Sequence, residues 1–190
     1  TLPDYEEGYF WWRGQQPQGA PVDADGNPVF HTVPKSYADA KSDGERWRWM
    51  LAQTMELNAD RRDEVLFSFA QFLNGQFGVE TMAQFDWFGR FADDSANAEV
   101  ADNEGEKKSG TFALHTLSDD ETIARLATGV KRFKLPDEFN FFRIWQQLAE
   151  RRGTWGDQAC DQIAHFYENR RQYPKAVEAW KRAIKDVGPG

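Results

Sequence analysis

The three histidines and the single cysteine have the most direct potential for chemistry, but their spacing argues against a shared site. His31, His115 and His165 are far apart, and none has a second His or a Cys at the helical spacing of metal ligands. A general base also needs an orienting partner, which the neighbouring residues do not offer. We therefore expect no catalytic residue, and we expect His165 to be a partly buried structural residue beside the apolar stripe of its helix.

The stretch DADGN, Asp23 to Asn27, resembles the start of a calcium-binding loop. A loop of the EF-hand kind has its glycine later, ends in a bidentate Glu and lies between two helices. Here Gly26 comes early and prolines flank the segment, so the residues predict a turn. The sequence thus predicts neither a metal site nor a cofactor.

Charge and composition limit the classes of partner. The 190 residues carry a formal net charge of -8, with 40% hydrophobic and 28% charged residues, which is typical of a globular protein. A net negative charge opposes binding to phosphate backbones, so we do not expect a nucleic-acid partner. No apolar run approaches the roughly 20 residues that span a bilayer, so we expect no membrane insertion. One cysteine excludes an intrachain disulfide and leaves the compartment undecided.

Hydrophobic periodicity predicts a mainly α fold of antiparallel helical hairpins, stacked as in a tetratricopeptide array. Ser42 with Glu45, and Ser118 with Glu121, have the spacing of a capping box, which marks the start of a helix. The patterns predict helices over about 43–57, 65–77, 119–134 and 141–152, and a weaker one over 79–91. We expect no strand beyond the N-terminal region.

The chain divides into two regions that differ in amino-acid composition and hydrophobic periodicity. Residues 1–40 are rich in Gly and Pro and form an irregular N-terminal arm, in which 21–33 could pair as a short β-hairpin across Asp25-Gly26. Residues 41–190 form the helical domain. Within it, 92–110 is acidic and nearly free of large apolar side chains, which predicts a mobile loop.

The clearest repeat covers residues 157–190 and resembles the tetratricopeptide repeat. Small residues Ala164 and Ala176 would allow two antiparallel helices to approach closely, with Trp180 filling the space beside them. Arg171 departs from the pattern, because glycine commonly eases the turn between the helices. A single repeat cannot bury its own apolar face, so a stack of hairpins is expected.

Several stretches resemble the helical N-terminal region of large bacterial proteins of the alpha-2-macroglobulin family: KSDGERWRWMLAQTMEL, LFSFAQFLNGQFGVET, KSGTFALHTLSDDETIARLATGVKRFKLPDEFNF and YENRRQYPKAVEAWKRAIKDVGPG. The resemblance implies a periplasmic or cell-envelope location and a parent protein that traps proteases. That family's thioester motif is Cys-x-Glu-Gln. Here Cys160, Asp161 and Gln162 are consecutive, so this motif cannot form a thioester at Cys160.

We therefore hypothesise a non-catalytic helical module that binds a protein, an extended peptide or adjacent domains of the same polypeptide. The candidate contact residues are five less regularly placed tryptophans: Trp11, Trp12, Trp49, Trp87 and Trp155. One alternative is an architectural spacer without a ligand of its own. Another is an all-α hydrolase with paired carboxylates, although no acidic residue falls within an apolar stripe where burial would raise its pKa.

Overall fold

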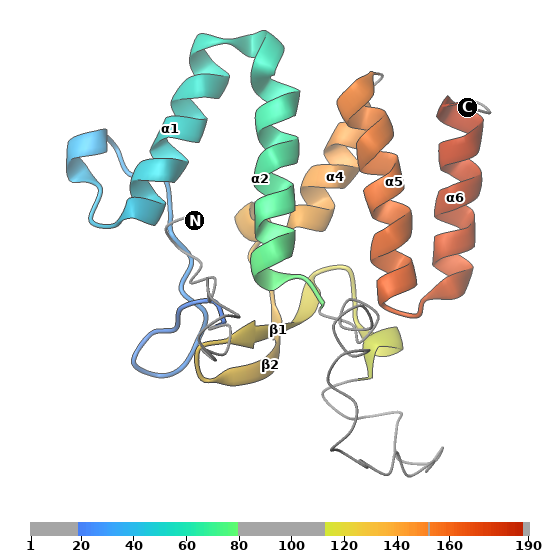
Figure 1. The fold of residues 1–190 in the computed structure, drawn as a ribbon, viewed down its shortest axis with the longest axis horizontal. Coiled ribbons are helices and arrows are strands. Elements are labelled where there is room, and N and C mark those ends of the chain that lie inside the picture. The colour runs from blue at the N-terminus through green and yellow to red at the C-terminus, as the bar shows by residue number, and fades with distance from the viewer. Residues whose placement is uncertain (1–18, 80–112, 152, 188–190) are drawn as a thin grey trace, which may run out of the picture.

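The structure, a computed structural model, describes residues 19–79, 113–151 and 153–187. In these ranges five α-helices and one two-stranded antiparallel sheet are present, which confirms the mainly α class. Figure 1 shows the helices side by side in a row, with the small sheet below the lower end of α2. The helix predicted over 79–91 and the loop predicted over 92–110 lie outside the described residues, apart from Val79.

The first hairpin consists of α1 (Asp43–Leu57) and α2 (Arg62–Phe77). The Ser42 hydroxyl accepts a hydrogen bond from the backbone N–H of Glu45, and the Glu45 carboxylate accepts one from the backbone N–H of Lys41. These bonds satisfy donors that the first helical turn leaves open, so the predicted start of α1 is confirmed. At the other end α2 stops at Gly78, as its pattern predicts.

The predicted helix over 119–134 is wrong. This segment forms a β-hairpin of β1 (Glu121–Leu126) and β2 (Gly129–Lys134), in which Glu121 pairs with Lys134 and Leu126 with Gly129. The expectation of no strand in the helical domain fails with it.

Side-chain burial and one glycine explain this outcome. Thr122, Ala124 and Leu126 lie on one face of β1 and are all buried, and Ile123 on the other face is buried as well. The two-residue loop between the strands ends at Gly129, whose φ of 123° disfavours other residues. The hydroxyl of Thr122 donates to the backbone carbonyl of Phe77 and so attaches the sheet to the last turn of α2.

The described part of the N-terminal arm forms less of a hairpin than expected. Its pairing is a single bridge between Val22 and Pro28, around a turn in which the Asp23 carboxylate accepts from the backbone N–H of Asn27 at 2.8 Å. The predicted turn at DADGN is therefore confirmed. Ala20 instead forms a single parallel bridge with Leu126 of β1 and donates to the carbonyl of Arg125 at 3.0 Å, so the arm is attached to the edge of the sheet.

The other three helices are α4 (Phe141–Ala149), α5 (Thr154–Asn169) and α6 (Tyr173–Val187). Helix α4 packs between α2 and α5, and α6 packs on α5, so the core continues along the row. Its largest fully buried apolar side chains are Trp145, Phe77, Phe141, Phe142, Leu73, Leu126 and Leu148. Ala164 and Ala176 are also buried, which agrees with the predicted close approach of α5 and α6.

The turn between α5 and α6 puts Arg171 in the left-handed region, at a φ of 56°. This is the position where the repeat pattern has glycine, and the Arg171 side chain is exposed. We predict that Arg171→Gly raises the free energy of unfolding by about 0.5 kcal/mol, because the relief of backbone strain exceeds the added entropy of the unfolded chain. Arg171→Ala keeps the Cβ and should give no gain in a urea titration.

Candidate protein-binding groove

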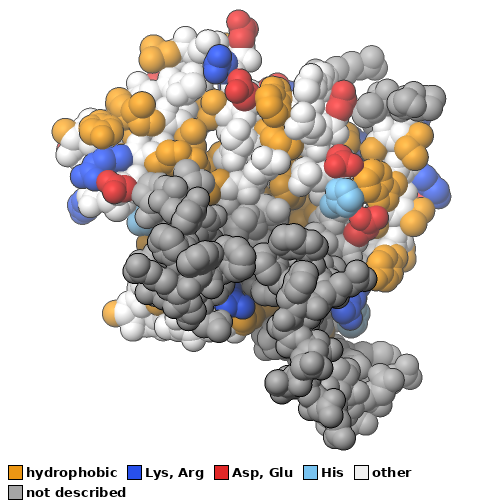
Figure 2. Space-filling model, in the orientation of Figure 1, with side chains coloured by type: hydrophobic (Ala, Val, Ile, Leu, Met, Phe, Trp, Pro, Cys, Tyr) orange, Lys and Arg blue, Asp and Glu red, His pale blue; other side chains and the backbone are white. Residues whose placement is uncertain are grey.

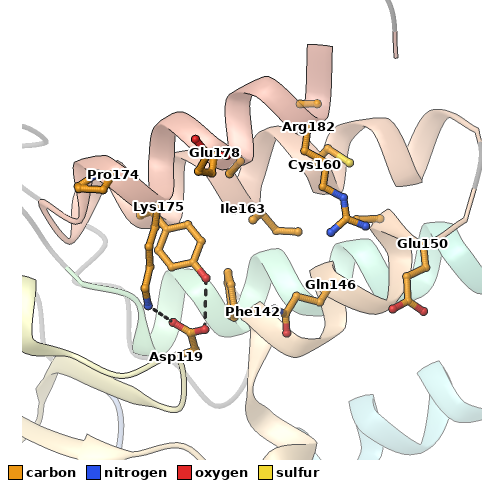
Figure 3. Close-up of a pocket in the computed structure, with 14 residues that line it drawn as sticks. Asp119, Phe142, Gln146, Glu150, Cys160, Ile163, Pro174, Lys175, Glu178 and Arg182 are labelled. Atoms are coloured by element: carbon orange, nitrogen blue, oxygen red, sulfur yellow. Dashed lines mark hydrogen bonds and ion pairs between the residues drawn. The ribbon is translucent and has the colours of Figure 1, made fainter. Parts of the chain in front are cut away.

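A groove of about 760 Å³ lies where α4, α5 and α6 meet. Helices α4 and α6 supply its sides, and α5 supplies the base between them (Figure 3). The apolar lining residues are Phe142, Ala149, Cys160, Ile163, Pro174, Ala179 and Ala183. The groove therefore has an apolar lining that no described side chain covers.

Charged and polar side chains follow the edges of the groove. Asp119 and Lys175 lie at one end, while Glu150 lies at the other, as Figure 3 shows. Between them, Glu178 and Arg182 stand on α6 one turn apart. An occupant of the groove would thus meet an apolar base and charges of both signs along its length.

The Asp119 end is organised by hydrogen bonds. The Tyr167 hydroxyl donates to one carboxylate oxygen of Asp119 at 3.2 Å, and the Lys175 ammonium group donates to the other at 3.2 Å. Burial, and then the charge of Asp119, raise the pKa of Tyr167, so its phenol stays neutral and remains a donor. Asp119 is thus held in one orientation by groups from both α5 and α6.

Asp119 belongs to a segment that docks onto the turn between α5 and α6. Arg170 is 1% exposed, lies over the Phe166 ring at 3.7 Å, and donates to the carbonyl of Ser118 at 2.7 Å. Burial lowers the pKa of Arg170 to about 10, which still leaves it charged at neutral pH. Gln172 donates to the carbonyl of Leu117 at 2.6 Å. This end of the groove therefore depends on contacts between residues about 50 positions apart in sequence.

Glu121, beside this segment, gives the fold a measurable pH dependence. Hydrogen bonds from Arg132 and then from Ser118 lower the pKa of Glu121 to about 2. A lowered folded-state pKa means that this stabilisation is complete above pH 4.5 and is lost as the pH falls toward 2. We predict that Glu121→Gln lowers the free energy of unfolding by about 1 to 2 kcal/mol at pH 7. The difference from the native protein should shrink when urea titrations are repeated down to pH 2, whereas a constant difference would contradict this role.

The tryptophans predicted to bind a partner do not line the groove where the structure describes them. Trp49 packs against Tyr37, with ring centroids 5.7 Å apart, and Trp155 packs against Phe67 at 5.4 Å. Both are half-buried. Trp11, Trp12 and Trp87 lie outside the described residues.

Sequence reasoning missed the groove residues on α6. Lys175, Glu178, Ala179 and Arg182 recur at intervals of three and four, which puts them on one helical face. That periodicity was the available signal, but a charged face is typical of a solvated helix and does not by itself indicate a site.

The histidines remain separate in the described structure. His165 is half exposed, and its ring lies 2.9 Å from the Glu168 carboxylate and 3.7 Å from that of Asp161. This half exposure agrees with the predicted position of His165 beside the apolar stripe of α5, where its ring packs edge-on against Trp180. The His31 ring hydrogen-bonds with the hydroxyl of Ser42, at the start of α1, at a distance of 3.1 Å.

The described residues contain no group of three or more His, Cys, Asp or Glu side chains arranged to hold a metal ion. None of the helices in those ranges has the length and apolar character needed to cross a membrane.

Comparisons with known proteins give no family assignment: no protein-family model, curated protein or solved structure matches the chain. The resemblance to alpha-2-macroglobulin-family proteins therefore stays a prediction.

Proposed function

We propose that this protein is a non-catalytic helical module that binds an extended protein segment in the groove between α4, α5 and α6. The observation that carries the proposal is the groove itself, with a volume of about 760 Å³ and a lining drawn from three helices. Concave, mostly apolar surfaces with a few placed polar groups are where proteins commonly bind ligands.

The arrangement of the lining suits a peptide chain. The apolar lining, which includes Ile163 at the base and Ala179 on the α6 side, can accept side chains from one face of an extended segment. Gln146 and Glu150 on one side, and Glu178 and Arg182 on the other, can bond to its backbone and polar side chains. Because the edges carry both signs of charge, they select by sequence and not simply by net charge.

The carboxylates of the groove favour binding over hydrolysis. Asp119 is engaged by Lys175 and Tyr167, and Glu178 pairs with Lys181 at 3.0 Å. Glu150 lies at the far end from Asp119 (Figure 3). Paired acid and base groups act on one bond from neighbouring positions, which this separation does not provide.

Selection from a displayed library of random peptides, followed by hydrogen exchange, tests the proposal. The selected peptides should slow amide exchange in α5 and α6 around the groove, because a bound segment restricts opening of the helices that it bridges. Protection confined to the α1–α2 hairpin would place binding elsewhere, and failure to select any peptide would also count against the groove.

A further inference from the structure

Helix α6 carries a second surface, distinct from the groove, on its outer side. Tyr173, Val177 and Ile184 are 61%, 50% and 60% exposed, and Trp180 between them is half-buried. Their spacing of four, three and four residues places all four on one stripe of the helix. We call these four residues the α6 stripe. In Figure 1, α6 stands at the edge of the row of helices.

Charges of opposite sign flank the α6 stripe. On the α5 side lie Asp161 and Glu168, whose carboxylates contact His165, and the Trp180 indole donates to Glu168 at 2.8 Å. On the other side lie Lys181 and Lys185, one turn apart on α6, of which Lys181 also pairs with Glu178 at 3.0 Å. Figure 2 shows this order over α5 and α6, with acidic side chains and a histidine beside hydrophobic ones, and basic side chains at the outer edge.

We infer that the α6 stripe binds the α6 stripe of a second copy of this chain, with the two helices parallel about a two-fold axis. A stripe with one acidic and one basic flank is complementary to itself in this arrangement, because the acidic flank of each copy faces the basic flank of the other. An antiparallel pairing would put like charges opposite each other.

The residue types on the stripe support the same arrangement. Val177 and Ile184 are seven residues apart, and Tyr173 and Trp180 alternate with them, as in a coiled-coil seam. β-branched residues at the first core position of this repeat favour parallel two-stranded pairs. Such a short helix would be marginal alone, but packing on α5 already holds α6 in its helical form.

The positions of the charged residues along the helix axes predict one specific contact between the two copies. His165 lies against Trp180, with ring centroids 5.1 Å apart. Asp161 is one turn before His165, and Lys185 is about one turn after Trp180 on the antiparallel helix, so these two lie at the same height. In the parallel dimer, Asp161 of each copy would therefore face Lys185 of the other copy.

Sedimentation equilibrium of the full chain tests the inference. We expect a reversible dimer of the 21.9 kDa chain, with a dissociation constant on the order of 10 to 100 µM. Ile184→Lys should weaken the dimer at least about tenfold, because it places a charge in the apolar seam. Val130→Lys, at an exposed position on β2, is the matched control and should leave association unchanged.

A charge exchange separates this geometry from other dimers. Lys185→Glu should weaken association about threefold, and adding Asp161→Lys should restore it, because the contact is remade with reversed sign. A monomer throughout the concentration range, or a dimer indifferent to Ile184→Lys, would overturn the inference. If the double variant does not regain the native association, the parallel arrangement is wrong. The groove residues Glu178 and Arg182 lie on the opposite side of α6, so peptide binding should persist in Ile184→Lys.

Discussion

Replacing Arg170 with alanine is expected to lower the free energy of unfolding by about 3 kcal/mol. The substitution removes a buried side chain that stacks on Phe166, and it leaves the carbonyl of Ser118 without the donor that now lies 2.7 Å away. The effect should be large because Arg170 joins the turn after α5 to the segment that carries Asp119.

A second substitution separates packing from hydrogen bonding. Arg170→Met retains much of the volume over Phe166 and avoids the cost of burying a charge, so we expect a loss of only about 1 to 2 kcal/mol. Urea unfolding followed by circular dichroism measures both variants. Equal losses for alanine and methionine would show that the hydrogen bond dominates, whereas no loss for alanine would contradict the anchoring role of Arg170.

Two identical spacings in the sequence had different outcomes, and their surroundings explain why. The Ser42 hydroxyl accepts from the backbone N–H of Glu45 and caps α1. The hydroxyl and backbone N–H of Ser118 instead donate to the Glu121 carboxylate, and this segment leads into a strand. In the second case Glu121 pairs with Arg132 across the hairpin at 2.9 Å. The capping pattern spans only four residues, so it could not indicate this partner eleven residues away or the turn that Gly129 permits.

The candidate groove was less accessible from sequence than the helices that form it. Apolar residues spaced three and four positions apart predicted α1, α2, α4, α5 and α6, because each helix buries one face. One end of the groove depends instead on the position of Asp119, which accepts hydrogen bonds from Tyr167 and Lys175. Contacts of that kind join segments distant in sequence, so the local spacing of apolar residues gives no indication of them.

Replacing Trp145 with alanine is expected to lower the free energy of unfolding by about 4 kcal/mol, because the site is sealed and cannot collapse fully. Trp145 is 1% exposed and packs edge-on against Phe141, with ring centroids 5.3 Å apart. Phe141 is also on α4, but Trp145 belongs to the buried core cluster that includes Leu73 and Phe77 of α2, so it holds α4 to the core that supports one side of the groove.

Trp145→Phe is the informative companion to this change. The indole N–H of Trp145 makes no hydrogen bond in the described part of the structure, so phenylalanine removes a buried donor that gains nothing there. We expect a loss of about 1 kcal/mol in the same urea titration. A loss as large as that of alanine would indicate that the indole N–H has a partner essential to the fold.

Two adjacent glutamines on α4 provide the most direct test of the groove as a binding site. Gln146 and Gln147 are both exposed, but only Gln146 is among the residues that line the groove. Tryptophan at position 146 would occupy the groove, whereas tryptophan at position 147 adds the same side chain outside it. The pair therefore separates blockage of the groove from any general effect of the substitution.

The decisive measurement is the fluorescence anisotropy of a labelled peptide, selected from the displayed library, titrated with the native protein and with each variant. Binding in the groove predicts that Gln147→Trp keeps the native affinity and that Gln146→Trp weakens it at least about tenfold. Equal affinity for native protein and both variants would contradict the proposal that this protein binds its partner between α4, α5 and α6.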